Sequence, residues 1–148
     1  MSLFSYIASP RSLPEHLHNS FFFSIGNIRD RCSDFIFHKC FDNKFVYTLD
    51  SRLDYCPYTR KYEGGGIALG GWDGSLHKQS LDNRASLEFL IRHNLRAGEF
   101  IEVYSIFWSW SDPEELPPPE HTITIHVDEL QESRDFVLND GHKFIIYR

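Results

Sequence analysis

Histidine and cysteine are the residue types in this chain whose spacing could support chemistry. His16 and His18 are separated by one residue, and so are His38 and Cys40. Alternate residues of a strand share a face, so either pair could supply two metal ligands, and His38 with Cys40 could supply a base and a nucleophile. Neither pair has a third or fourth ligand at a recognisable spacing. We therefore expect ordinary histidines and no metal site.

Glycines are concentrated in residues 64–74, which invites comparison with a phosphate-binding loop. The segment matches neither G-x-G-x-x-G nor a loop that ends in Gly-Lys-Ser/Thr, and it predicts a glycine-punctuated strand with a tight turn instead. No cofactor is expected. The chain also lacks a G-x-S-x-G elbow. A small enzyme that uses His38, Cys40 or His126 in a pocket remains an alternative to a binding protein.

The cysteines and the first residues indicate a compartment. Three cysteines, Cys32, Cys40 and Cys56, cannot all pair within one chain. Reduced thiols of a cytoplasmic protein account for them. The N-terminal residues have no basic segment before their short apolar stretch, and no segment approaches the roughly 18 apolar residues of a membrane helix. We expect a cytoplasmic protein without a membrane span.

Charge is distributed unevenly along the chain. Residues 1–98 contain twelve Lys/Arg and ten Asp/Glu, a net charge of +2, whereas residues 99–148 contain three Lys/Arg and eleven Asp/Glu, a net charge of −8. Such an acidic third either keeps the protein soluble or attracts a basic partner. It would repel phosphates, and no basic stripe is present, so nucleic-acid binding is disfavoured.

The acidic loop, residues 108–120, is the strongest candidate for a binding site. It has four carboxylates, no basic residue and four prolines, which limit the entropy lost on binding. The alternative is a solvated connector between two strands. A third possibility is a small-ligand module that uses Trp72, Trp108 and Trp110. The predicted partner-binding residues are Trp110, as an aromatic anchor, with Asp112, Glu114, Glu115 and Glu120.

The elements that would position this loop are an amphipathic helix and several strands. Apolar residues recur at i, i+3, i+4 and i+8 between about 82 and 96, which predicts a helix that ends before Gly98. Phe100–Trp108 is rich in β-branched and aromatic residues and predicts a central strand. Thr122–Val127 alternates, as in a half-exposed strand. Strands are also expected over 3–8, 21–25, 35–41 and 45–49.

Turn signals complete the expected fold. Asp140-Gly141 between two apolar runs predicts a hairpin of residues 136–138 with 144–147, and residues 42–44 predict a second hairpin. A capping box at residues 12–15 predicts a short helical turn. The expected fold is therefore a single α+β domain over residues 1–148. It has a mainly antiparallel sheet, one principal amphipathic helix and short helical turns.

The chain resembles bacterial immunity proteins encoded beside toxins of contact-dependent inhibition and other polymorphic toxin systems. The matching features are the capped helix, the acidic loop, the strand over 100–104 that runs into Trp108, the opening segment 3–14 and the closing segment 144–147. The resemblance implies a small cytoplasmic protein that caps one cognate toxin, often a basic nuclease, and catalyses nothing itself. We expect its acidic surface to meet the basic active-site face of such a toxin.

Overall fold

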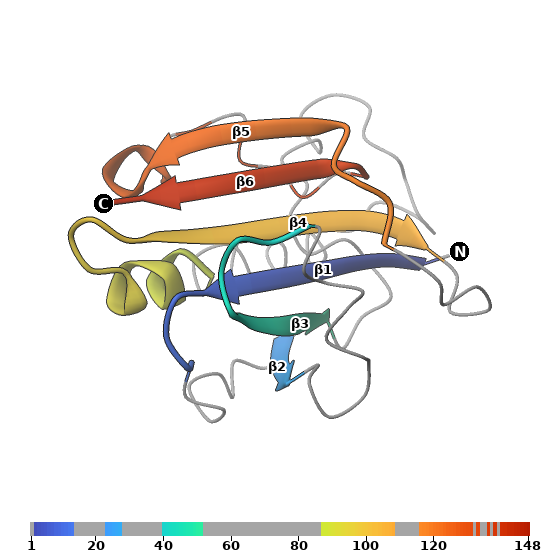
Figure 1. The fold of residues 1–148 in the computed structure, drawn as a ribbon, viewed down its shortest axis with the longest axis horizontal. Coiled ribbons are helices and arrows are strands. Elements are labelled where there is room, and N and C mark those ends of the chain that lie inside the picture. The colour runs from blue at the N-terminus through green and yellow to red at the C-terminus, as the bar shows by residue number, and fades with distance from the viewer. Residues whose placement is uncertain are drawn as a thin grey trace, which may run out of the picture.

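A six-stranded sheet organises the part of the chain that the structure describes (Figure 1). The computed structural model describes residues 2–13, 23–27, 40–51, 87–108, 116–131, 133, 136, 138 and 140–148. The strand order is β2-β3-β1-β4-β6-β5. The strands are β1 (Ser2–Ser9), β2 (Phe23–Asn27), β3 (Phe45–Ser51), β4 (Phe100–Trp108), β5 (His121–His126) and β6 (His142–Tyr147).

The sheet is mixed, with one parallel pair among the described strands. β1, β2, β3, β4 and β6 pair antiparallel, whereas β5 pairs with β6 in parallel. The central pair joins distant parts of the sequence, because Tyr6 of β1 lies opposite Tyr104 of β4. The α+β class and the mainly antiparallel sheet are confirmed.

Two strands match their predicted bounds closely. β4 spans Phe100–Trp108, lies between β1 and β6, and is buried from Ile101 to Ile106. β5 alternates as predicted, since Ile123 and Ile125 point toward the core while Thr122 and Thr124 are exposed. β1 and β2 fall within one or two residues of the predicted ranges 3–8 and 21–25.

The predicted amphipathic helix is confirmed where the structure describes it, at residues 87–94. Its stripe of Leu87, Leu90 and Ile91, continued by Leu95, is at most 2% exposed. The helix ends at Asn94, two residues before the predicted end, and Gly98, with φ 83°, lies in the turn that leads to β4. Residues 82–86 of the predicted helix lie outside the described residues. No helical segment in the described ranges has the length and apolarity needed to span a bilayer.

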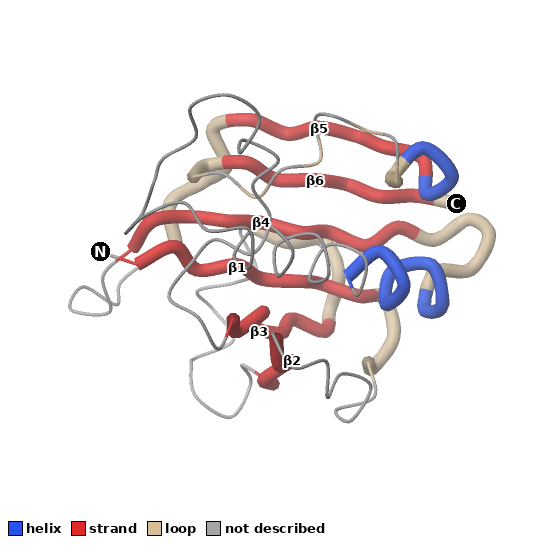
Figure 2. Tube along the Cα trace, turned by 180° about the vertical axis from the view of Figure 1, so that it is seen from behind, coloured by secondary structure: helices blue, strands red, loops and turns tan. Residues whose placement is uncertain are grey.

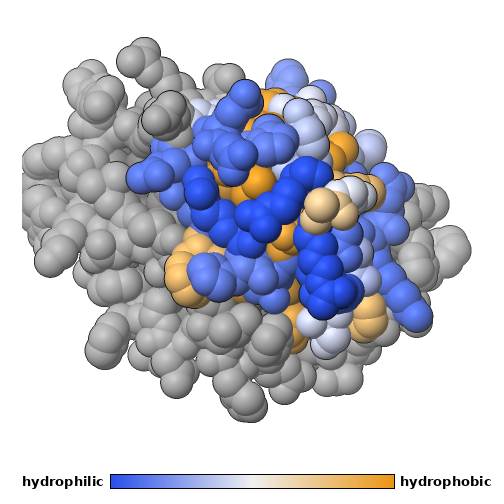
Figure 3. Space-filling model, turned by 90° about the vertical axis from the view of Figure 1, so that its left-hand side faces the viewer, coloured by the Kyte–Doolittle hydropathy of each residue, from blue (hydrophilic) through white to orange (hydrophobic). Residues whose placement is uncertain are grey.

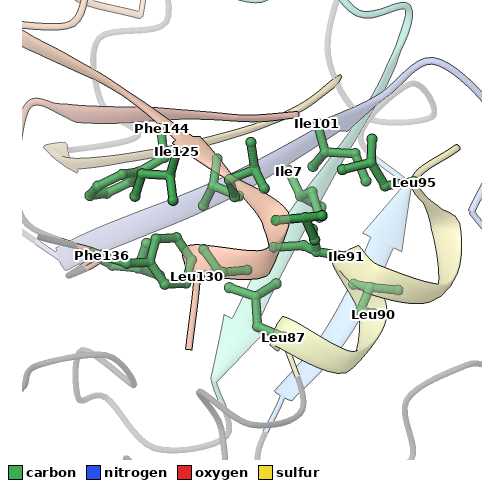
Figure 4. Close-up of a cluster of buried hydrophobic side chains, with 14 of the residues drawn as sticks. Ile7, Leu87, Leu90, Ile91, Leu95, Ile101, Ile125, Leu130, Phe136 and Phe144 are labelled. Carbon is green, nitrogen blue, oxygen red and sulfur yellow. The ribbon is translucent and has the colours of Figure 1, made fainter. Parts of the chain in front are cut away.

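The first face of the sheet packs against this helix and forms the larger apolar core (Figure 4). Ile7, Ile101 and Phe144 come from three neighbouring strands and are not exposed to solvent. Leu130 and Phe136, from the connection between β5 and β6, close the same core. Burial of apolar surface stabilises this face, at about 25 cal/mol per Å².

The second face is partly covered by residues 40–44, which cross in front of β4 and β1 in Figure 1. The helix lies on the opposite face and is in front in the reverse view of Figure 2. Phe41 makes edge-to-face contacts with Tyr6 and Tyr104, at ring distances of 6.4 and 6.1 Å. Cys40 and Leu116 complete this smaller cluster.

The predicted hairpin at Asp140-Gly141 is wrong, although the turn itself is present. Gly141 has φ 72°, but β6 pairs with β4 on one side and with β5 on the other. No edge of β6 is left for Phe136 and Leu138, which instead pack into the core. The apolar run at residues 136–138 therefore indicates packing into the core and not pairing with β6.

The other predicted turns have mixed outcomes. Short helical turns are confirmed by η1, a 3-10 turn at Val127–Glu129. In the second predicted hairpin β3 is present, but Phe41 lies outside a strand, and residues 35–39 are outside the described part. Ser12 and Leu13 are not helical, and the remainder of that capping box is not described.

Candidate binding surface at the β5 edge

Of the predicted partner-binding residues, Glu120 falls within the described part of the chain. It is exposed and immediately precedes β5. Trp110, Asp112, Glu114 and Glu115 lie outside the described residues. The loop prediction therefore stays a prediction for those four positions, and the surface can be built from Glu120 onward.

A glycine turn fixes the position of Glu120. The carbonyl of Gly141 accepts hydrogen bonds from the N–H groups of Glu120 at 2.9 Å and His121 at 3.1 Å. A Cβ atom at Gly141 would lie 3.1 Å from Cγ of Glu120, and its φ of 72° disfavours other residues. Asp140, also exposed, precedes this turn. Two carboxylates thus lie at the end where β5 and β6 begin.

More carboxylates lie at the opposite end of β5. His126 accepts a hydrogen bond at Nδ1 from the N–H of Asp128, at 3.2 Å, and thereby caps η1. Val127 and Leu130 are buried and anchor the turn, so Asp128 and Glu129 point outward and are exposed. Glu120 with these two residues places carboxylates at both ends of the strand. We call Glu120, Asp128, Glu129 and Asp140 the acidic edge.

The acidic edge includes residues that the loop prediction missed. Asp128 and Glu129 follow a strand and were not assigned to the site. The sequence contains a signal for them, because no Lys or Arg occurs between Arg96 and Arg134. A stretch of that length without a positive charge indicates a wider acidic surface than a single loop.

Two acids of the C-terminal third do not contribute to this surface. Glu99 accepts hydrogen bonds from the Arg11 guanidinium at 3.1 and 3.2 Å, and from the N–H of Arg96 at 3.0 Å. The Arg11 hydrogen bond, with the one from Arg96, lowers the pKa of the Glu99 carboxyl below its usual range. Arg11 also donates to the carbonyl of Asn94 at 2.6 Å, which gives a hydrogen-bond partner to a carbonyl at the C-terminal end of the helix.

The second is Glu102, which is not exposed at all and forms a buried ion pair. Its Oε1 lies 2.7 Å from Nζ of Lys143, which is 8% exposed and also donates to the carbonyl of Cys40 at 2.7 Å. The same carboxylate accepts the N–H groups of Asp42 and Asn43, at 3.0 and 2.9 Å. This pair therefore holds the segment 40–44 on the second face.

Tyr104 fixes the chain just before the acidic edge. Its hydroxyl donates to the carbonyl of Pro117 at 2.7 Å, while Sγ of Cys40 lies 3.7 Å from the carbonyls of Leu116 and Pro117. Burial raises the pKa of Tyr104, and negative charge on Cys40, Asp140 and Glu120 raises it further. The entry to β5 is thus held against the second face.

A partly polar strip lies beside the acidic edge on the second face of the sheet. Thr122 and Thr124 are exposed, Tyr147 is 43% exposed, and the rings of His126 and Tyr147 are 5.0 Å apart. The end of the molecule with η1 and the C-terminal residues presents a mainly hydrophilic surface with small apolar areas (Figure 3).

Cys40 and His126, two of the three residues of the enzyme alternative, do not lie together in the described structure. Cys40 is 2% exposed and its carbonyl contacts Lys143, whereas His126 pairs with Tyr147, four residues further along β6. Four residues of strand span roughly 13 Å, too far for a shared proton transfer. His38 lies outside the described residues.

The described residues also add nothing to the metal-site hypothesis or to the tryptophan-module hypothesis. His121 and His142 form an edge-to-face pair at 5.0 Å, but no group of three or more His, Cys, Asp or Glu among the described residues could hold a metal ion. His16, His18, Trp72 and the glycine-rich run 64–74 lie outside this part. The backbone of Trp108 ends β4.

The chain matches no protein-family model, no curated protein and no solved structure.

Proposed function

We propose that this protein is a cytoplasmic immunity protein that binds and neutralises a toxin with a basic surface, most simply a nuclease. The observation that carries the proposal is the acidic edge, where Glu120, Asp128 and Glu129 are exposed at the two ends of β5. No Lys or Arg occurs in the stretch of sequence between Arg96 and Arg134 that contains all three. The sequence resemblance to immunity proteins supports the same conclusion.

The physical argument concerns the field of a nuclease. Such an enzyme must attract phosphate, so its active-site face is basic, and an acidic inhibitor is attracted by the same field. Rim carboxylates of this kind mainly raise the association rate and its dependence on salt. Glu99 and Glu102 form ion pairs within the fold, so the exposed carboxylates are the ones that would attract the basic partner.

The test measures binding to the product of the gene immediately upstream. The triple variant Glu120→Gln, Asp128→Asn, Glu129→Gln keeps side-chain shape and removes three charges. We expect its association rate to fall by about tenfold at 50 mM salt and by much less at 500 mM, with a shallower salt slope. The same charges should be needed to protect cells that express the toxin.

The matched control is Asp42→Asn, which removes an exposed carboxylate from the segment 40–44. We expect it to leave the rate within about twofold, because this carboxylate lies outside the acidic edge. Failure of the upstream product to bind the wild-type chain would refute the proposed function. An unchanged rate and salt slope in the triple variant would show that the acidic edge serves solubility alone.

A further inference from the structure

β5 is an outer strand of the sheet, and its backbone hydrogen bonds can be assigned. It pairs with β6 in parallel, with His121 opposite His142. Because the N–H of His121 donates to the carbonyl of Gly141, the odd residues of β5 direct their backbone groups toward β6. The even residues, Thr122 and Thr124 among them, direct their N–H and C=O groups to the outer side.

Among the described residues, no strand pairs with that outer side. Thr122 and Thr124 are exposed, and within the described ranges β6 is the strand that pairs with β5. The six residues extend over roughly 20 Å, and the four between the terminal histidines are Thr and Ile, which favour the extended conformation. An edge of this kind is a template for a strand from another chain.

Charge decides which strand fits. Self-pairing in the antiparallel direction about the middle of β5 would bring Glu120 of one copy beside Asp128 and Glu129 of the other. Self-pairing in the parallel direction would bring each carboxylate beside its own counterpart. Like charges opposite one another destabilise a pair of strands, so a second copy is disfavoured. A segment with Lys or Arg at its ends would meet carboxylates at both ends.

We propose that the β5 edge binds an extended, basic segment of the toxin by adding it to the sheet as a further strand. This inference rests on the proposed function and names the mode of binding. The backbone groups of Thr122 and Thr124 supply the hydrogen bonds. The carboxylates of Glu120, Asp128 and Glu129 select the charge of the segment and fix its register.

Amide hydrogen exchange tests the assignment directly. In the free protein the amides of Ile123 and Ile125, bonded to β6, should exchange more slowly than those of Thr122 and Thr124. In the complex with the upstream gene product, Thr122 and Thr124 should gain at least about tenfold protection. A complex in which these two amides exchange as fast as before would overturn the inference and leave the proposed function intact.

A pair of variants at one position separates the backbone from the side chain. Thr124→Pro removes an outward N–H and spares the bonds to β6, a substitution that edge strands tolerate. We expect it to weaken toxin binding by about tenfold, the equivalent of one lost hydrogen bond. Thr124→Val keeps the N–H and should bind within about twofold of wild type.

Two further outcomes are decisive. Wild-type affinity of a folded Thr124→Pro variant, as judged by its thermal melt, would overturn the inference. If that variant fails to fold, the exchange measurement on the wild-type complex still decides. Protection of Thr122 and Thr124 that rises with protein concentration in the absence of toxin would identify a second copy as the occupant and would also overturn it.

Discussion

The two faces of the sheet are stabilised in different ways. The first face packs the helix at 87–94 and the β5 to β6 connection into a core whose buried members carry no charge. The second face carries a smaller cluster beside the Glu102–Lys143 ion pair, which holds the segment 40–44 through directed hydrogen bonds. The stabilisation from apolar burial is roughly proportional to the buried area and has no preferred direction. A buried ion pair stabilises the fold only when both charged groups are correctly positioned.

The largest effect should follow from breaking the ion pair on the second face. Lys143→Met leaves the Glu102 carboxylate buried without its cation, and we expect it to lower the free energy of unfolding by about 3 to 5 kcal/mol. Urea denaturation measures this value. The double variant Glu102→Gln, Lys143→Met buries no charge and should be more stable than the single variant. Additive losses in the double variant would contradict the buried-charge explanation.

A cavity on the first face should cost slightly less. Leu90 is fully buried in the helix stripe, so Leu90→Ala should lower the free energy of unfolding by about 3 kcal/mol. Phe89, next to it, is 52% exposed and provides the matched control, because Phe89→Ala empties no core volume. Equal losses from the two substitutions in urea would contradict the assignment of this helix face to the core.

A smaller effect is expected where the segment 40–44 contacts the sheet. The Asn43 amide donates to the carbonyls of Ala8 at 3.3 Å and Phe100 at 2.8 Å. Asn43→Ala removes both bonds and should lower the free energy of unfolding by about 1 to 2 kcal/mol. Asp42→Ala, at another exposed side chain of the same segment, serves as the control in the same thermal melts. A loss no greater than the control's would show that the ion pair alone holds the segment.

The smallest effect concerns pH at the rim of the first face. The pKa of Glu99 is lowered by Arg11, so its contribution to stability is present above the ordinary carboxyl pKa near 4.5 and is lost as the pH falls through the lower, folded value. Arg11→Met should flatten the decline in melting temperature below pH 4.5. Arg148→Met, at an exposed C-terminal side chain, should leave the decline unchanged. A wild-type decline in Arg11→Met would rule out this pair as its source.

Local periodicity predicted much of the described sheet and helix, because both depend on neighbouring residues. The stripe of Leu87, Leu90 and Ile91 follows from helical spacing, and the bounds of β4 follow from its run of β-branched and aromatic residues. Periodicity assigns a residue to a face but does not choose the strand beside it, so the parallel pairing of β5 with β6 was not predicted. The same limit explains the wrong hairpin at Asp140-Gly141.

The candidate site shows the same limit for charge. Composition identified an acidic C-terminal third, yet it could not separate exposed carboxylates from Glu99 and Glu102, which the fold uses. A signal was present, since Glu102 and Lys143 each interrupt an apolar strand, and two opposite charges in neighbouring buried strands suggest a pair. Their register becomes known only when β4 and β6 are placed side by side.

The pairing of β1 with β4 has a consequence for the order of events during synthesis. Tyr6 and Tyr104 face each other across the middle of the sheet. At roughly 5 to 20 residues per second, a ribosome needs about 5 to 20 s to make the chain between them. Throughout that interval the nascent β1 lacks its β4 partner, and closing so long a loop favours slow folding. A chaperone that shields the first strand would therefore act mainly before β4 emerges.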